Sequence, residues 1–458
     1  MLRIGWASVD MTPDRPVLLA GQHYTRVSTH VNDPLTVTAL AIESDDGSEQ
    51  ALMLSADLVS FSLDVQERVR QRVRQDLPDL DSRKLFINAI HTHTSLTLAE
   101  GVYDLPDEVD VMTPTECLEL FVEKAAEAAV EAWRNRTPGG VSRAFGHAVV
   151  GHNRRASYFD GTSKMYGKTD VEAFEHVEGY EDHSLDVLFT WEADRKLTGM
   201  VVNLACPSQV TENAMYVSAD FWHEVRQVLR ERHGSGLFVL GQCAAAGDQS
   251  PHFILYGPQE AFMRERSGLT EREEIARRIA NGVYEVIDGA SKDIQNALRF
   301  KHVVEDLNLP ARRITEEEYE SAKAERKQFQ GEMDSGKPGK ATYRLLDRAK
   351  SVIARYEAQE KSPVFTMELH VLRLGEVAIA TNPFELFLDY GMRIRAQSRA
   401  ERTFVVQLAC GVGSYLPSRR AEGYGGYGGL IINGQVGSDG GNRLVDESVV
   451  EIAKLFPA

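Results

Sequence analysis

Two short apolar segments of this chain run directly into turns whose side chains are able to do chemistry. Residues 84–90 end at His91-Thr92-His93, and residues 237–240 lead into Gly247-Asp248-Gln249-Ser250-Pro251. Helical periodicity recurs between such segments, for example over residues 115–136. Because active sites of α/β proteins are commonly built where strands end, this alternation predicts an α/β fold: one large domain of mixed β-sheets with flanking helices.

Turn-forming residues between apolar segments predict two β-hairpins. One is centred on Ser44-Asp45-Asp46-Gly47 and the other on Asp194-Arg195-Lys196. Residues 315–361 are rich in Glu, Lys, Arg and Ala, which predicts a charged helical hairpin inserted into the domain and exposed to solvent. Glycines are dense between residues 423 and 441, which favours a flexible loop that closes over the site. Without a repeat or a convincing linker, we expect one domain over residues 1–458.

The charge of the chain restricts its partners. Its 458 residues include 51 Lys and Arg against 68 Asp and Glu, a formal net charge of −17. Nucleic acids and anionic membranes favour basic faces, and no apolar run approaches the roughly 18 residues of a membrane span. We therefore expect a small-molecule substrate, no nucleic acid and no membrane insertion. Four cysteines without CxxC spacing, and an N-terminus without an apolar core of signal-peptide length, favour a cytoplasmic protein; a homo-oligomer stays open.

His91-Thr92-His93 is the most informative local motif. Two histidines at i and i+2 on an extended segment point to the same side, so both can face one pocket, and imidazole is the commonest zinc ligand. Most isolated triplets of this kind are ordinary surface or core histidines. Three further ligand-type residues elsewhere in the chain favour a metal site. They are His223 near a helix start, His252 after the turn of residues 247–251, and Glu385 in Asn382-Pro383-Phe384-Glu385.

Short motifs along nearly the whole chain resemble those of the neutral/alkaline (non-lysosomal) ceramidase family, which consists of zinc-dependent amide hydrolases. The family opens with Gly-x-Ala-x-x-Asp-Ile-Thr-Pro, and this chain has Gly5-Trp6-Ala7-Ser8-Val9-Asp10-Met11-Thr12-Pro13. The resemblance implies the ceramidase catalytic-domain fold in a divergent, bacterial-type member. The other matching motifs, in family order, are residues 32–35, 55–58, 88–94, 153–155, 217–221, 247–251, 382–385 and 413–417.

The resemblance implies a zinc site at His91, Glu385 and Tyr415, which match ligand positions of the family. Considered without the family, these residues leave purely structural roles open. A carboxylate such as Glu385 is favoured at a helix N-terminus by the helix dipole, and Tyr415 suits a packed aromatic ring with its hydroxyl in a loop.

Four further positions match residues around the reacting carbonyl. The resemblance implies that His93, Arg154 and Tyr427 line this carbonyl. Ser250 matches the residue assigned in the family as nucleophile or essential hydroxyl. No general base stands beside Ser250 in the sequence, so whether it attacks or orients the substrate stays open.

One family ligand has no counterpart. The family places a second zinc histidine in a run like Asn-x-Ala-Cys-His-Pro, whereas here the run is Val202-Asn203-Leu204-Ala205-Cys206-Pro207-Ser208-Gln209. Catalytic zinc needs about three protein ligands beside its open position. We expect His223 as the best substitute and Cys206 as the next, with His252 and His152 as remoter candidates. A site of three ligands without a substitute is the remaining alternative.

These residues predict a zinc-dependent hydrolase that cleaves an amide (N-acyl) or related acyl bond of a small, polar substrate. A zinc-activated water would be the nucleophile, because the cation acidifies bound water and polarises the carbonyl. Two alternatives stay open: a hydrolase of another class on the same metal scaffold, for instance one acting on carbohydrate, and a metal-free ligand-binding protein.

Overall fold

A mixed sheet of eight strands is the centre of the structure, a computed structural model that describes residues 2–103, 110–336, 338–339 and 341–457. The strand order is β12-β11-β10-β5-β1-β2-β3-β4. The outermost pair at each end, β11 with β12 and β3 with β4, is parallel. The strands are β1 (Leu2–Asp10), β2 (Thr36–Ser44), β3 (Gln50–Ala56), β4 (Leu85–Ala89), β5 (Thr137–His147), β10 (Ser184–Glu192), β11 (Leu197–Leu204) and β12 (Phe238–Cys243).

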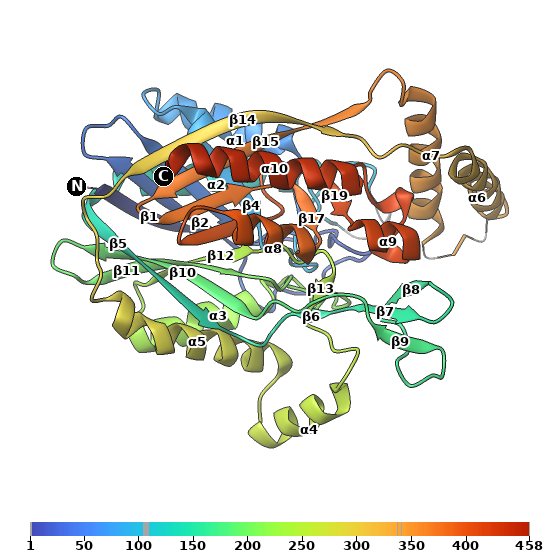
Figure 1. Cartoon of the computed structure of the whole chain (residues 1–458), viewed down its shortest axis with the longest axis horizontal. Coiled ribbons are helices and arrows are strands. Elements are labelled where there is room, and N and C mark those ends of the chain that lie inside the picture. Colours follow the sequence, from blue (N-terminus) through green and yellow to red (C-terminus); the bar gives the residue numbers. More distant parts are fainter. Residues whose placement is uncertain (1, 104–109, 337, 340, 458) are drawn as a thin grey trace.

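A second sheet of four strands packs against the first across a layer of apolar side chains (Figure 1). Trp6 and Leu240 enter this layer from the first sheet, and Leu372 and Phe404 enter it from the second. Since alternate residues of a strand point to opposite faces, both faces of each sheet are apolar. The second sheet contains β14 (Phe300–Pro310), β15 (Val364–Leu374), β16 (Val377–Thr381) and β18 (Arg402–Val406), in that order.

Three small sheets lie in the connections between these elements. The pair β17 and β19 is parallel, and the pair β6 and β13 is antiparallel. The bounds are β17 (Phe384–Leu386), β19 (Ser414–Leu416), β6 (His152–Asn153), β13 (Gln249–Ser250), β7 (Arg155–Tyr158), β8 (Ser163–Met165) and β9 (Phe174–Val177).

Helices cover the two outer faces, which gives a helix–sheet–sheet–helix arrangement (Figure 1). α1 and α2 pack on one half of the large sheet, α3 and α5 on the other half, and α8 and α10 on the second sheet. The helices are α1 (Leu63–Asp76), α2 (Pro114–Arg134), α3 (Phe221–His233), α4 (Gly257–Ser267), α5 (Glu271–Ala290), α6 (Glu316–Asp334), α7 (Thr342–Ala358), α8 (Leu388–Gln397), α9 (Arg419–Tyr424) and α10 (Ser438–Leu455), with short 3₁₀ turns at Ser82–Lys84, Tyr427–Gly429 and Ile431–Asn433.

Local sequence explains where several helices begin. Thr113, Thr270 and Thr315 each accept a hydrogen bond from the backbone of a glutamate three residues later, and that glutamate bonds back to the threonine. Such capping boxes satisfy amide groups that the first helical turn leaves free. α2 crosses β1 at Gly5, where an added Cβ would lie 2.1 Å from the carbonyl oxygen of Ala132.

The predicted fold class is confirmed, and both predicted hairpins form, as β2–β3 and β10–β11. The glycine-dense stretch differs from the flexible loop we expected. It folds into α9, two 3₁₀ turns and the start of α10. Its glycines allow close packing: at Gly441 a Cβ would lie 2.4 Å from the ring of Tyr390.

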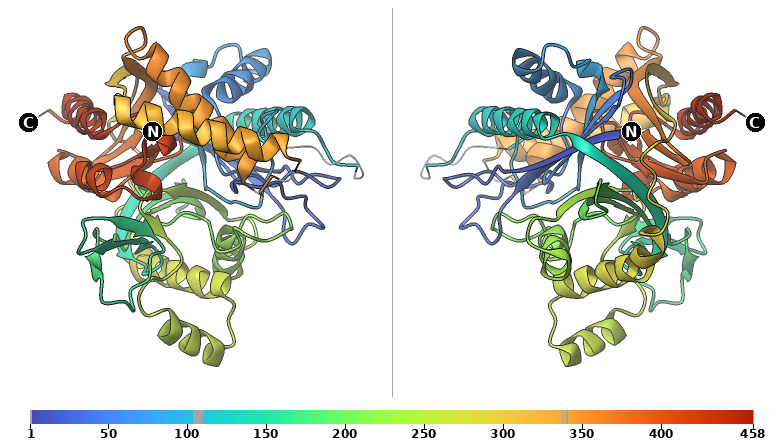
Figure 2. Two further views of the ribbon diagram at one scale, coloured as in Figure 1. Left: turned by 90° about the vertical axis from the view of Figure 1, so that its right-hand side faces the viewer. Right: turned by 90° about the vertical axis from the view of Figure 1, so that its left-hand side faces the viewer.

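The predicted helical hairpin is α6 and α7, which cover one end of the sheets (Figure 2, left). Only α6 fits the expectation of a solvent-exposed insertion, since Ala322 is its one buried residue. α7 buries one face, and its Val352 and Ile353 pack on α6 and on the 3₁₀ turn at Ile431–Asn433. Within the described parts of the chain, no helix has the length and apolar character needed to cross a membrane.

Candidate metal centre and active-site pocket

Strand ends from both large sheets bring the predicted ligands together. His91 follows β4, whose Ala89 amide donates to Leu408 O beyond β18. Glu385 and Tyr415 are register partners on the parallel strands β17 and β19. The Nε2 atom of His91 lies 3.5 Å from a carboxylate oxygen of Glu385. The structure therefore places side by side three residues that stand far apart in the sequence.

His91 has the geometry of a metal-binding histidine. Its Nδ1 atom lies 2.8 Å from Val59 O, and since a carbonyl oxygen only accepts, Nδ1 carries the proton. The neutral ring then presents a lone pair on Nε2, which is how a backbone carbonyl orients histidine ligands in metal sites. His91 also has a positive φ of 71°, a conformation costly for a residue with a side chain and concentrated at functional sites.

The protonation of the second histidine is fixed by its neighbours. Arg154 donates to the Oε1 atom of Gln209, with a distance of 3.3 Å, so the amide nitrogen of Gln209 must face His93. That nitrogen lies 3.0 Å from Nε2 of His93, which therefore accepts. Burial, together with the neighbouring His91 and arginines, lowers the pKa of His93 well below its usual value. His93 is thus a neutral ring at pH 7.

Three electron-rich atoms then meet without a proton between them. Nε2 of His91 lies 3.3 Å from Nε2 of His93 and 3.5 Å from the Glu385 carboxylate. Lone pairs at these distances repel one another unless a cation lies between them. Nitrogen and oxygen donors with an open side toward a pocket suit a catalytic zinc ion. His91 and Glu385, with the Tyr415 hydroxyl hydrogen-bonded to that carboxylate, are therefore a candidate site for a divalent cation.

Electrostatics favour the charged form of Glu385. Burial by itself works against a carboxylate, but His91 in its protonated form, Arg154 and a hydrogen bond from Tyr415 lower the pKa of Glu385 below its usual value. Arg154 donates to the Tyr415 hydroxyl over 3.1 Å and to Gly247 O over 2.9 Å. Burial opposes the charge of Arg154 as well, yet Tyr415, Tyr166 and Glu385 raise its pKa well above the usual value.

The candidate site opens into a cavity of about 810 Å³. His91, His93, Glu385, Tyr415 and Tyr427 all line it, whereas Arg154 lies behind Tyr415 and Gln209. One part of the wall is apolar and comes from the segments around α1 and α2, with Phe61, Val65, Leu98 and Leu118.

The remaining wall combines the predicted Tyr427 with polar groups that the sequence did not single out. Tyr427 packs its ring edge-on against Tyr415, with ring centroids 5.4 Å apart, and its hydroxyl lies 2.9 Å from Nε2 of His23. α7 adds Arg344 and Arg348, so the predicted insertion forms part of the pocket.

Ser250 lies outside this pocket wall. Its side chain is fully buried, and its hydroxyl is 2.8 Å from that of Tyr166 and accepts from the amide of His252 over 3.0 Å. Tyr166 in turn is hydrogen-bonded to Arg154. Ser250 is therefore linked to the metal centre through Tyr166 and Arg154.

The structure does not bring the expected substitute ligands to His91. The Nε2 atom of His223 lies 2.8 Å from the side-chain amide of Gln227 on the same helix. The thiol of Cys206 donates to Val150 O, and burial raises its pKa well above the usual value. His252 pairs with Glu212 and Glu271.

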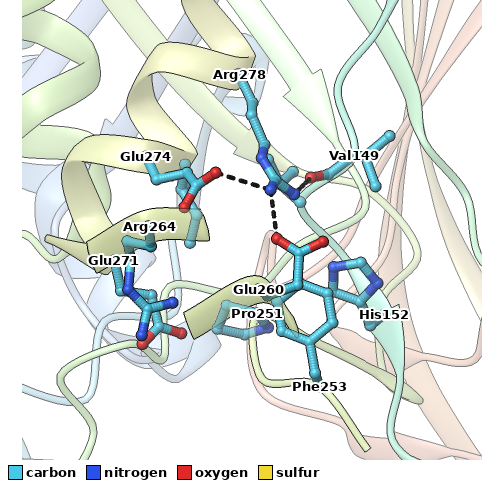
Figure 3. A pocket seen from close by; sticks show the side chains of 11 residues that line it. Val149, His152, Pro251, Phe253, Glu260, Arg264, Glu271, Glu274 and Arg278 are labelled. Carbon is cyan, nitrogen blue, oxygen red and sulfur yellow. Dashed lines mark hydrogen bonds and ion pairs between the residues drawn. The ribbon is translucent and has the colours of Figure 1, made fainter. Parts of the chain in front are cut away.

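His152 lies beside a separate cavity of about 20 Å³ (Figure 3). Its imidazole packs on Phe253, with ring centroids 4.0 Å apart. The charged groups of this cavity largely neutralise one another, because Arg278 pairs with both Glu260 and Glu274. The cavity holds about one water-sized group and is distinct from the pocket at His91.

Gln209 lies two residues after the position at which the motif lacks the family histidine. It is buried and bridges His93 and Arg154. The sequence did contain a signal, because Gln209 ends the very run that lacks the histidine. Tyr166 and His23 had no such signal: each is a single polar residue in a loop, and only the fold places it here.

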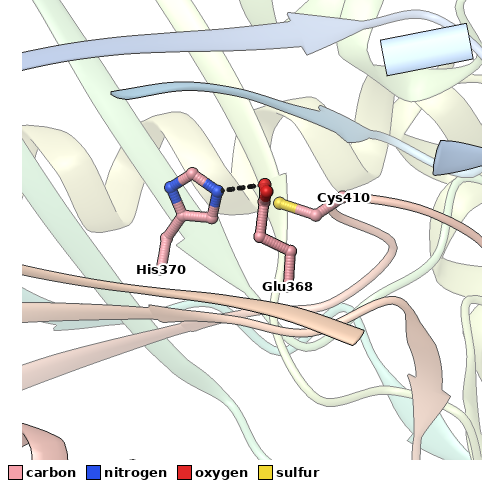
Figure 4. Close-up of side chains that lie close together, drawn as sticks. All are labelled: Glu368, His370 and Cys410. Carbon is pink, nitrogen blue, oxygen red and sulfur yellow. Dashed lines mark hydrogen bonds and ion pairs between the residues drawn. The ribbon is translucent and has the colours of Figure 1, made fainter. Parts of the chain in front are cut away.

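A second group of ligand-type side chains is buried elsewhere. Among the described residues, Glu368, His370 and Cys410 offer ligand atoms within 4.8 Å of one another, close enough to hold a metal ion (Figure 4). The carboxylate of Glu368, however, already pairs with Arg70 at 2.6 Å and with His370 at 2.7 Å. Burial also raises the pKa of Cys410 to about 12. A metal ion here would have to displace a guanidinium and deprotonate a buried thiol.

The fold is that of the ceramidases, as the motifs of the sequence predicted. The structure matches neutral ceramidase from Pseudomonas aeruginosa with a TM-score of 0.74 and 17% sequence identity, over 99% of this chain and 74% of that one. It also matches a ceramidase complexed with C2, with a TM-score of 0.72 and 14% identity, over 99% of this chain and 75% of that one. No protein-family model and no curated protein matches the sequence. At this identity the likeness establishes the fold alone.

Proposed function

We propose that this protein is a zinc-dependent hydrolase that cleaves an amide or a related acyl bond, with the cation held by His91, Glu385 and Tyr415. One observation carries the proposal. Nε2 of His91, oriented by Val59 O, faces the Glu385 carboxylate at 3.5 Å at the wall of a large pocket. The ceramidase fold supports an amide as the scissile bond, because ceramide is an amide.

The cation would supply Lewis acidity, which polarises a carbonyl and lowers the pKa of water. Residues of the chain would accept the proton and hold the side chains of the site in position. His93 is neutral and lines the pocket, so its Nε2 can take a proton from an attacking water if the contact with Gln209 yields. Arg154 keeps its positive charge and holds Tyr415 in place from behind.

Ser250 and Tyr427 have supporting roles in this proposal. Ser250 is buried and hydrogen-bonded to Tyr166, so its part is to position Arg154 through Tyr166. The hydroxyl of Tyr427 contacts His23 and Arg348 at the pocket wall. From there Tyr427 orients the substrate, while its ring packs edge-on against Tyr415.

The pocket favours a small substrate with an apolar acyl group. The apolar side chains Phe61, Val65, Leu98 and Leu118 would accept the acyl group, while the arginines and His23 form a polar region.

We place the enzyme in the cytoplasm, since its four cysteines are all buried and unpaired.

A panel of N-acyl compounds tests the activity. N-octanoyl derivatives of an amine, an amino acid and glucosamine are offered to protein stripped with a chelator and to protein reloaded with zinc. We expect amide hydrolysis only after reloading, and its loss in Glu385→Gln. Glu401→Gln, at an exposed ion pair with Arg143, is the matched control. Hydrolysis that survives complete removal of metal would contradict the proposal.

A further inference from the structure

Two arginines of α7 lie in the pocket without a carboxylate partner among the described residues. Arg344 and Arg348 line the same cavity as His91 and Glu385. Within the described ranges of the chain, neither forms an ion pair with an aspartate or glutamate, although the chain as a whole carries a net charge of −17. Unpaired cations in a half-enclosed pocket of an acidic protein call for an explanation.

The neighbours of Arg348 leave its charge uncompensated. Its guanidinium lies 3.4 Å from Nε2 of His23 and donates to the Tyr427 hydroxyl over 3.2 Å. Burial, and then the charges of Arg348 and Arg344, lower the pKa of His23 to about 4. His23 is therefore neutral near pH 7, and both partners of Arg348 are uncharged.

Arg344 lies near the same imidazole. Its charge also acts on His23, so the two guanidinium groups lie near one ring. The Nε atom of Arg344 is buried and lacks a hydrogen-bond partner in the described structure. A buried N–H group without an acceptor costs free energy that a ligand oxygen would recover.

The acidic groups of the pocket are largely engaged elsewhere. Asp64 pairs with Arg68 at 3.0 Å, and Glu100 accepts from the hydroxyl of Thr115 over 2.7 Å. Glu385 belongs to the metal centre. Asp347 is exposed and carries no ion pair in the described residues. The arginine pair is thus left as a local positive charge.

This positive charge lies near the metal centre. Arg348 contacts Tyr427, whose ring packs against Tyr415, and Tyr415 is hydrogen-bonded to Glu385. One molecule in the cavity of about 810 Å³ can reach both the arginines and the metal centre.

We propose that Arg344 and Arg348 form a subsite for an anionic group of the substrate, a carboxylate or a phosphate. Guanidinium groups bind both through charge-assisted, often bidentate hydrogen bonds. The inference rests on the proposed function and specifies its substrate class: an N-acyl compound that carries a negative charge at the end away from the acyl chain.

Binding of matched pairs tests the subsite. One pair is N-octanoylglycine and its neutral glycinamide; the other is N-octanoyl-O-phosphoethanolamine and N-octanoylethanolamine. Calorimetry on the full chain should give at least about tenfold tighter binding of the anionic member of one pair, as charge-assisted hydrogen bonds allow. The pair that shows the preference identifies the group as carboxylate or phosphate. Equal binding, or no binding, in both pairs would overturn the inference.

Variants tie the preference to the two arginines. The double variant Arg344→Gln/Arg348→Gln should abolish the preference, and each single change should reduce it about threefold. Lys350→Gln removes a positive charge from the exposed side of the same helix and should retain it. A preference that persists in a folded double variant overturns the inference; if that variant does not fold, the single changes decide.

Hydrolysis is measured separately on the same compounds. An anion preference in binding without hydrolysis would leave the subsite standing and remove the proposed hydrolase. If charged and neutral members are hydrolysed at equal rates and bind equally, the proposed hydrolase would stand and the anionic subsite would be overturned.

Discussion

Glu385 and Tyr415 face each other as register partners on two parallel strands, and the tyrosine hydroxyl donates a hydrogen bond to the carboxylate. The strands β17 and β19 have three residues each, so a short pairing sets the relative position of two proposed ligands. Ser414, next to Tyr415, has a positive φ of 55°, and His91 has one of 71°. Strained backbone at two of the three ligand segments indicates that the surrounding fold enforces this geometry.

Gln209→His should strengthen metal binding. The amide of Gln209 lies 3.0 Å from Nε2 of His93, beside the place where a further imidazole would complete the ligand set. We expect zinc to bind about tenfold tighter or more, measured by competition with a chromophoric chelator. Gln328→His, on the exposed face of α6, is the control for a histidine added at the surface. Unchanged affinity in Gln209→His would place Gln209 outside the reach of the cation.

Gly21→Ala should disturb His93. Gly21 has a φ of 102°, and an added Cβ would lie 2.5 Å from the imidazole of His93. We expect about 1 kcal/mol of backbone strain and, because His93 must move, a loss of activity of about 100-fold. Gly161→Ala is the control: Gly161 also has a positive φ, of 80°, but an added Cβ there would have no neighbouring atom within 4 Å. If both variants lose the same activity, the contact with His93 is irrelevant.

The sequence singled out residues that the structure brings together, while their role as metal ligands stays a prediction. His91, Glu385 and Tyr415 lie in local motifs, and the structure brings them together. His223 was chosen by its nearness in sequence to the missing histidine, but helix α3 directs it toward Gln227. The path of the chain after β11, which delivers Gln209 instead, depends on tertiary packing that no local pattern encodes.

The same limit applies to the charged helices. High charge predicted exposure of residues 315–361, and α6 follows that expectation. α7 has the stronger apolar stripe, with Leu346, Ala349, Val352 and Ile353 buried. That stripe packs on α6 and on the 3₁₀ turn at Ile431–Asn433, while Arg344 and Arg348 of the same helix line the pocket. Composition over the whole segment concealed the difference between the two helices.

Glu368→Gln should destabilise the fold. Glu368 pairs with Arg70, which is 1% exposed, and the variant leaves this guanidinium without its main counter-charge. We expect a loss of about 3 kcal/mol in the free energy of unfolding at pH 7, measured by denaturant titration. Glu401→Gln, at an exposed pair with Arg143, should change it by less than about 1 kcal/mol. Equal effects would show that burial of the Arg70 pair is unimportant.

The stability difference should also depend on pH. Burial opposes ionisation, but His370 and Arg70 lower the pKa of Glu368 from 4.5 to about 2. A lowered pKa in the folded state stabilises the protein above the unfolded pKa and stops doing so as the pH falls through the folded one. The gap between wild type and Glu368→Gln should therefore be full above pH 4.5 and shrink toward pH 2. A gap that widens on acidification would contradict this.

Ser250→Ala should retain most of the activity. A serine nucleophile would cost on the order of 10⁶-fold in kcat when removed. Because Ser250 is buried against Tyr166, we expect a loss below about 100-fold, through misplacement of Arg154. Tyr166→Phe, which removes the same hydrogen bond from the other side, should have a similar effect. A loss of five orders of magnitude in Ser250→Ala alone would make the serine the nucleophile.

The zinc content of protein purified without added metal tests the central claim most directly. We predict about one zinc ion per chain in wild type, as a single catalytic site requires, and its loss in Glu385→Gln. Cys410→Ser and His223→Ala should keep the metal, since both residues lie away from the proposed centre. Wild-type protein that contains no zinc and takes up none on titration would contradict the account, as would zinc that Glu385→Gln retains and Cys410→Ser loses.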